Sequence, residues 1–73
     1  FFSIYPNPAA DVLNFSSDDE IASVAIYNLA GQKVLQQTGN VKNLNVSNLA
    51  AGAYLATATL PDGASSTVKF LKR

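Results

Sequence analysis

Few residues of this sequence could take part in catalysis. The 73 residues contain no histidine and no cysteine, which excludes a His-activated nucleophile, thiol catalysis and a Cys-based zinc site. Two carboxylates could hydrolyse a glycoside. Three of the five acidic residues are adjacent, at Asp18–Glu20, and the other two, Asp11 and Asp62, look like turn or strand-start residues. A chain this short also leaves little room for a substrate cleft. We therefore predict that the protein is not an enzyme and uses no cofactor.

The charged residues are unevenly distributed. Asp18–Glu20 is an acidic cluster that could bind calcium, but it lacks the spaced ligands and the glycine of an EF-hand loop. We interpret it as a solvated loop without a metal site. Lys69, Lys72 and Arg73 are three of the five basic residues. They could contact an acidic partner or simply keep a terminus soluble.

The composition is that of one small domain built without disulfides. The formal net charge is zero, which gives no support for nucleic-acid binding, because phosphate contacts need a basic excess. No apolar run approaches the roughly 20 residues of a membrane helix, so we expect no membrane insertion. The sequence begins without a Met or a signal peptide. We therefore expect residues 1–73 to be one domain of a longer protein.

Short alternation of apolar and polar residues dominates the chain and predicts β-strands. The predicted strands are residues 12–16, 22–28, 32–37, 41–46, 53–60 and 66–71, with a short edge strand at 3–5. The third run is centred on Val34. The other residues predicted to face inward are Leu13, Phe15, Val24, Ile26, Leu44, Val46, Tyr54, Ala56, Ala58, Leu60, Val68 and Phe70.

The segments between these runs carry turn residues. Asn28–Gly31 and Leu60–Gly63 each suit a type I turn followed by a glycine in the left-handed region. Between the fourth and fifth runs, Ser47 could cap one helical turn in which Leu49 plugs the core. About seven short strands joined by such turns predict an all-β fold, a small immunoglobulin-like antiparallel β-sandwich.

Five segments in order resemble a known family. They are Tyr5–Pro8, Asp11–Phe15, Ile26–Val34, Leu49–Tyr54 and Lys69–Arg73. They supply a Y-P-N-P opening, an I-Y-N-x-x-G hairpin, a G-x-Y strand start and a basic K-F-x-K end, and they span almost the whole chain. In this order and spacing they resemble the type A C-terminal sorting domain of cargo proteins of the type IX (Por) secretion system of Bacteroidetes.

The resemblance implies a role in export. Cargo of this family crosses the inner membrane by an N-terminal signal, and the C-terminal domain folds in the periplasm. The outer-membrane translocon and its shuttle protein then recognise that domain. A surface sortase of the cysteine-protease type usually removes it, and the cargo is released or joined to anionic lipopolysaccharide. The cargo would precede this domain in the same chain and end at the cell surface or outside the cell.

The family's functional positions carry over residue by residue. The terminal element that the translocon is thought to recognise matches Lys69, Phe70, Lys72 and Arg73. The other family-motif positions match Pro6, Asn7, Pro8, Gly31, Gly52 and Tyr54. Physical roles are also expected: Gly52 lets the chain turn into its strand, Tyr54 fills a core of small residues, and Asn7 between two prolines gives a rigid, extended start. Ala56 and Ala58 stand where the family more often has larger aliphatic residues.

Two other classes of function stay open. One is an immunoglobulin-like adhesion or carbohydrate-binding accessory domain, and the other is a passive spacer beside a catalytic domain. Tyr5, Tyr27 and Tyr54 could form a sugar-binding platform. They are spread along the chain, so packing in the core and at strand edges is the favoured interpretation.

Overall fold

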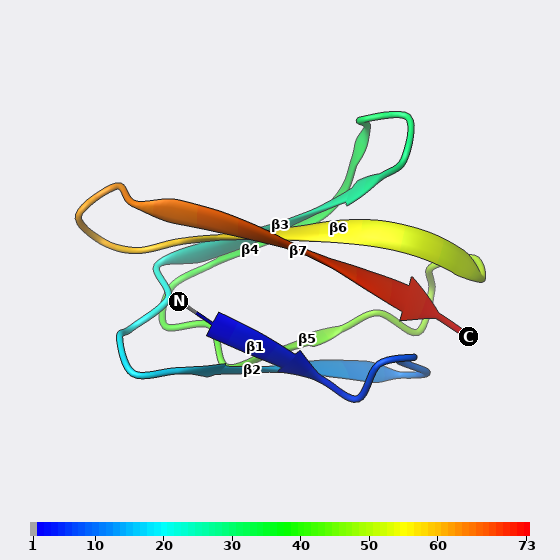
Figure 1. Cartoon of the computed structure of the whole chain (residues 1–73), viewed down its shortest axis with the longest axis horizontal. Helices are drawn as coiled ribbons and strands as arrows, with labels where there is room; N and C mark the ends of the chain where they lie inside the picture. Colours follow the sequence, from blue (N-terminus) through cyan, green and yellow to red (C-terminus); the bar gives the residue numbers. More distant parts are fainter. Residues whose placement is uncertain (1) are drawn as a thin grey trace.

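Two antiparallel sheets pack face to face in the computed structural model, which describes residues 2–73 (Figure 1). One sheet has the strand order β1-β2-β5 and the other the order β4-β3-β6-β7. The strands are β1 (Phe2–Tyr5), β2 (Val12–Ser17), β3 (Ser23–Asn28), β4 (Lys33–Thr38), β5 (Asn43–Asn45), β6 (Gly52–Thr59) and β7 (Ser65–Lys72). The predicted all-β sandwich of seven short strands is confirmed. The described residues contain no helix that could cross a membrane.

The core lies between the two sheets and follows the alternation of the strands. Leu13 and Phe15 of β2 are buried, whereas Val12 next to them is 41% exposed. Leu60 and Val68, both predicted to face inward, are only half-buried. They lie just after the end of β6 and on the edge strand β7, where neighbouring side chains cover them on fewer sides. The buried set is Ala9, Leu13, Phe15, Ile21, Val24, Ile26, Val41, Leu44, Val46, Tyr54, Ala56, Ala58 and Phe70.

The two predicted hairpin turns are confirmed. In the β3–β4 turn, the Gly31 N–H donates to the Asn28 carbonyl at 3.0 Å, and Gly31 has φ = 88°. The Asn28 side-chain oxygen also accepts from the Ala30 and Gln32 N–H groups, at 3.0 Å each. In the β6–β7 turn, the Gly63 N–H donates to the Leu60 carbonyl at 3.0 Å. Both turns therefore use a local hydrogen bond that the sequence already specifies.

The prediction that centred the third run on Val34 was wrong by one residue. Ile26 faces Leu35 across the β3–β4 ladder, but the next residue, Tyr27, faces Lys33, so Val34 is an extra residue at a bulge. Leu35 packs against the core, while Val34 is 37% exposed. Because strand side chains alternate with period two, a one-residue shift exchanges the residues that face inward and outward.

The loop between β5 and β6 differs from its prediction in one respect. It forms a turn closed by the Leu49 N–H and the Val46 carbonyl at 3.0 Å, not a helical turn capped by Ser47. The Asn45 side chain supplies the capping oxygen, which accepts from the Ser47 N–H at 2.9 Å. Leu49 is partly buried against the core, as predicted.

The segment around Asn7 is bent and not extended. Residues 6–8 form bends, and the Tyr5–Pro6 and Asn7–Pro8 peptide bonds are both cis. β1 pairs antiparallel with β2, so the chain must reverse direction between Tyr5 and Val12. The prediction of an extended start was therefore wrong.

The alternation in β2 gives a direct stability test. Replacing the fully buried Leu13 by Ala should lower the free energy of unfolding by about 2–5 kcal/mol, because it removes transfer energy and leaves a cavity. The matched control, Val12→Ala, changes an exposed residue on the opposite face and should shift stability by no more than about 0.5 kcal/mol. Urea unfolding followed by circular dichroism measures both. Equal losses would contradict the assignment of faces.

Candidate functional site

The family motifs from distant parts of the sequence meet at the C-terminal half of β7. This strand pairs with β6 so that Lys72 faces Gly52 and Phe70 faces Tyr54. The G-x-Y start of β6 and the K-F-x-K end of the chain are therefore directly opposed. β7 is an edge strand of the four-stranded sheet, so no further strand of that sheet pairs with its other side.

Phe70 is completely buried and belongs to the core. Its ring stacks on that of Tyr54, with the two centroids 5.7 Å apart and an interplanar angle of 25°. The Tyr54 hydroxyl donates to the Ala50 carbonyl at 2.6 Å, so its one polar group has a partner. Next to them on β6, Ala56 and Ala58 are also fully buried and contribute little volume. The two aromatic rings therefore supply much of the bulk at this end of the sandwich.

The basic residues of the terminal element do not form one continuous surface. Lys69 is exposed on the outer side of β7, opposite to Phe70. Lys72 lies on the same side as Phe70 but at the end of the strand, half-buried, with its Nζ donating to the Arg73 main-chain oxygen at 2.7 Å. Arg73 is exposed. The structure thus divides the predicted recognition residues between two faces and the chain end.

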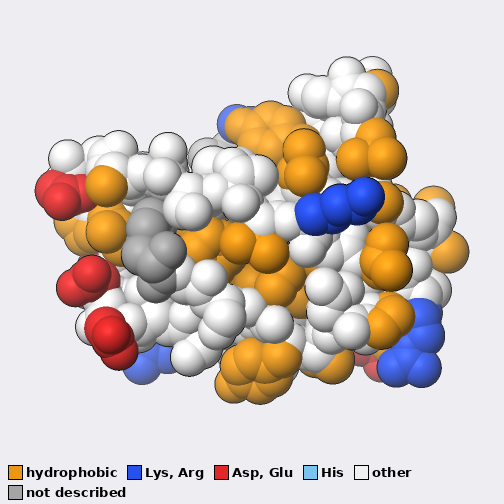
Figure 2. Space-filling view, in the orientation of Figure 1, with side chains coloured by type: hydrophobic (Ala, Val, Ile, Leu, Met, Phe, Trp, Pro, Cys, Tyr) orange, Lys and Arg blue, Asp and Glu red, His pale blue; other side chains and the backbone are white. Residues whose placement is uncertain are grey.

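Most of the acidic side chains lie away from the basic C-terminal end, although Lys42 lines a hollow together with Asp19. In Figure 2 most visible Asp and Glu side chains lie at the end away from the C-terminus. The β2–β3 loop with Asp18–Glu20 and the β6–β7 turn with Asp62 both lie at that end (Figure 1). Lys72 and Arg73 lie at the other end, at the C-terminus. A negatively charged partner would therefore be attracted to the C-terminal end.

A bend near the start of the chain holds the C-terminal end of β7. The Leu71 N–H donates to the Asn7 side-chain oxygen at 2.9 Å, across 64 positions of sequence. The fully buried Ala9 completes the contact, because its N–H donates to the Leu71 carbonyl and its carbonyl accepts from the Arg73 N–H, both at 2.8 Å. We call the segment Asn7–Ala9 the clamp. Sequence reasoning missed Ala9, since a small residue after a proline carries no signal of a long-range contact.

Gly31 and Gly52, the two glycines among the family-motif positions, lie in different parts of the fold. Gly52 has φ = 149°, a backbone conformation that L side chains rarely adopt, although an added Cβ would meet no atom within 4 Å. Its requirement for glycine therefore comes from the backbone and not from packing. Gly31 lies in the β3–β4 turn, and β3 is separated from β7 by β6. It belongs to a hairpin apart from the C-terminal site.

The three tyrosines do not form a shared platform. Tyr5 ends β1 in the three-stranded sheet and is 55% exposed. Tyr27 lies half-buried on β3 of the other sheet, and Tyr54 is in the core. A carbohydrate-binding face made from all three is therefore absent from the described part of the chain.

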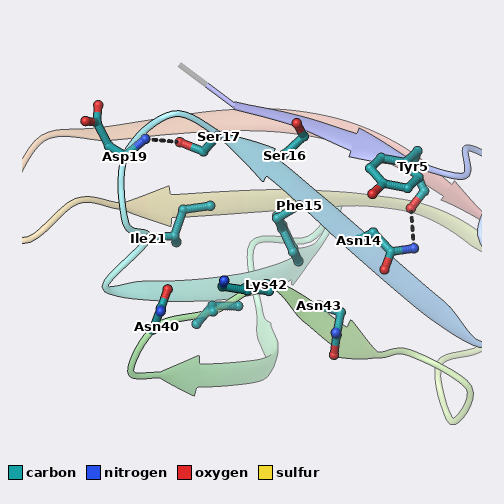
Figure 3. Close-up of a pocket in the computed structure, with 11 residues that line it drawn as sticks. Tyr5, Asn14, Phe15, Ser16, Ser17, Asp19, Ile21, Asn40, Lys42 and Asn43 are labelled. Atoms are coloured by element: carbon teal, nitrogen blue, oxygen red, sulfur yellow. Dashed lines mark hydrogen bonds between the residues drawn. The ribbon is translucent and has the colours of Figure 1, made fainter.

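A hollow beside β2 and β5 is lined mainly by polar side chains (Figure 3). Some of its polar groups bond locally: the Asn14 amide donates to the Tyr5 carbonyl, and the Ser17 hydroxyl accepts from the Asp19 N–H, both at 3.2 Å. Among residues 2–73, no three acidic side chains are grouped so that they could hold a metal ion, including those of Asp18–Glu20. The charged and aromatic side chains in its lining are Asp19, Lys42, Tyr5 and Phe15.

Comparison with known proteins gives two matches. The sequence model of a family described as "Secretion system C-terminal sorting domain" matches residues 3–73. The chain is also 38% identical over 66 residues to Beta-agarase D of Zobellia galactanivorans. That alignment covers 90% of this chain but 13% of the agarase, so a segment like this one is a small part of a much larger protein.

The burial of Phe70 predicts a structural role for it. Phe70→Ala should cost about 3–5 kcal/mol, which is comparable to the whole stability of a domain this small. The control is Leu71→Ala, which changes the next residue, 48% exposed on the other face. Thermal unfolding should show loss of the transition for the first variant and little change for the second. A stable Phe70→Ala domain would contradict this assignment.

The clamp predicts an effect of Asn7 on a residue at the far end of the chain. Asn7→Ala removes the acceptor for the Leu71 N–H and should cost about 1 kcal/mol. The Leu71 amide should then exchange its hydrogen faster. Asn7→Asp keeps an oxygen acceptor and should retain most of the protection. Amide exchange measured by NMR tests this, and an unchanged Leu71 rate in Asn7→Ala would exclude the contact.

Proposed function

The chain belongs to the family of secretion system C-terminal sorting domains, and from this premise we propose that it directs a fused cargo across the outer membrane by the type IX system. This family consists of sorting signals and not of enzymes. The observation that carries the proposal is the family match over residues 3–73, which includes the basic end of the chain. The cargo domain would precede residues 1–73 in the same protein.

The proposed recognition site is the basic C-terminal end. Lys69 and Arg73 are exposed and Lys72 is half-buried at the end of β7, so their charges are available to an acidic surface of the translocon or its shuttle protein. Phe70 is buried and would contribute through the fold, by holding β7 against Tyr54. In this proposal the partner recognises a folded strand end and not a flexible tail.

The proposed route ends at the cell surface. The domain would fold in the periplasm, pass the translocon with its cargo, and then be removed by a surface sortase at a site before the opening motif Pro6–Pro8. The pairing of β1 with β2 and the bonds from Asn7 and Ala9 to β7 support a cleavage site upstream of β1. Proteases cut flexible segments more readily than hydrogen-bonded ones.

A reporter fusion tests the proposal. The chain is placed behind a periplasmic reporter in a host with a type IX system, and the reporter outside the cells is measured. We expect export of the unchanged fusion and a severalfold loss in Lys69→Glu/Arg73→Glu, because the exposed charges are reversed. The matched control Lys33→Glu/Lys42→Glu makes the same change of net charge at the two lysines elsewhere in the chain and should export normally.

The outcomes separate two parts of the proposal. If the unchanged fusion stays in the periplasm, the export function is wrong. If it is exported and Lys69→Glu/Arg73→Glu is exported equally well, the basic end is not the recognition site. Point substitutions test the basic side chains more specifically than deletion of residues 69–73, because the deletion also removes Phe70 from the core. Unfolding curves of the purified variants must match that of the unchanged domain.

A further inference from the structure

The open edge of β7 is unlike the other sheet edges in the described part of the chain. β1 has four residues and is followed by Pro6, β5 has three residues, and β4 is interrupted by the bulge at Val34. Short strands, prolines and bulges are devices that prevent a sheet edge from pairing with another chain. β7 has eight residues, contains no proline and pairs with β6 in an unbroken register.

The backbone groups that point to this open edge can be identified. The clamp bonds to the Leu71 N–H and carbonyl and to the Arg73 N–H, so residues 71 and 73 present their backbone groups outward. Successive strand residues alternate, so Ser65, Thr67 and Lys69 do the same. The Thr57 and Thr67 hydroxyl oxygens lie 2.8 Å apart, as expected for a close pair whose backbone groups do not bond to each other.

These outward backbone groups lie in a stretch that the clamp leaves uncovered. The clamp pairs with β7 only at its C-terminal end, where Ala9 and Lys72 form a parallel bridge. Within residues 2–73, no other segment bonds to the outer edge of Ser65–Lys69. An added strand could therefore continue along the same edge, beginning where the clamp ends, and supply the backbone partners.

We propose that an extended segment of the export machinery adds as a β-strand to β7 along Ser65–Lys69. This inference rests on the proposed export function and identifies how the partner docks. Lys69 is the only charged residue in that stretch, and its side chain lies in a cross-strand row with the half-buried Tyr27 and Leu55. The added strand should therefore carry an acidic residue beside Lys69, and polar or β-branched residues beside Thr67.

The Thr67→Pro substitution tests this docking mode directly, because it alters the open edge of β7. Thr67→Pro removes an outward N–H and puts a ring on the edge, but it leaves the hydrogen bonds between β6 and β7 intact, as edge prolines do. Thr67→Ala is the matched control, because both variants lose the hydroxyl contact with Thr57 and only one blocks the edge. Both are placed in the reporter fusion and expressed in the type IX host.

We expect normal export of Thr67→Ala and roughly a tenfold loss for Thr67→Pro, the effect of losing about one hydrogen bond. Equal export of the two variants, with the unchanged fusion also exported, would overturn the edge proposal while leaving the export function in place. Retention of the unchanged fusion in the periplasm would overturn the export function itself. These two failures are therefore distinguishable.

Amide exchange of the unchanged chain gives an answer even if Thr67→Pro does not fold. Exchange is measured on the chain alone and with the purified outer-membrane translocon, after co-elution has established binding. The Thr67 and Lys69 amides should exchange roughly tenfold more slowly in the complex. The Leu71 amide, already bonded to Asn7, is the internal control and should not change.

Two results would contradict the proposal. Unchanged exchange at Thr67 and Lys69 in the bound chain would show that the partner docks elsewhere. Protection of the same amides in the chain alone, rising with its concentration, would assign the edge to a second copy of this chain. Analytical ultracentrifugation at the same concentrations distinguishes that case from binding to the translocon.

Discussion

The hydrogen-bonded position of β7 is the constraint on which the C-terminal part of the structure depends. On one side the strand pairs with β6 over eight residue pairs, and on the other Asn7 and Ala9 bond to its last residues. The second set of bonds connects the two sheets, because the clamp follows β1 of the three-stranded sheet. The two ends of the sequence are thereby fastened to each other, and the basic chain end is presented on ordered backbone.

The core that supports this arrangement is thin. A domain of this size buries only about 60% of the surface that its unfolded chain exposes, and here two of the buried β6 residues are alanines. The stacked rings of Tyr54 and Phe70 compensate for that missing volume. Loss of either ring should therefore affect any function of the domain through its fold, before a partner is considered.

Strand β7 has three roles because its side chains point alternately to the two faces of the sheet. Phe70 faces the core, the side chain of Lys69 faces solvent, and the backbone of Ser65–Lys69 lies along the open edge. A partner that recognised only the basic side chains would depend on charge and salt, whereas one that also paired with the edge would require the folded strand. A sorting signal that needs the fold would select cargo whose terminal domain has already folded.

The sequence by itself determined the strands, the two hairpin turns, the all-β class and the family, because period-two alternation and turn chemistry are local. It placed Leu13, Phe15, Tyr54 and Phe70 on inward faces correctly. It failed at Val34, because a bulge depends on the pairing of two strands and changes which residue faces inward. Only the tertiary structure decided that Asn7 and Ala9 bond to β7. Those contacts join residues more than 60 positions apart, and no local pattern in the sequence encodes such a pairing.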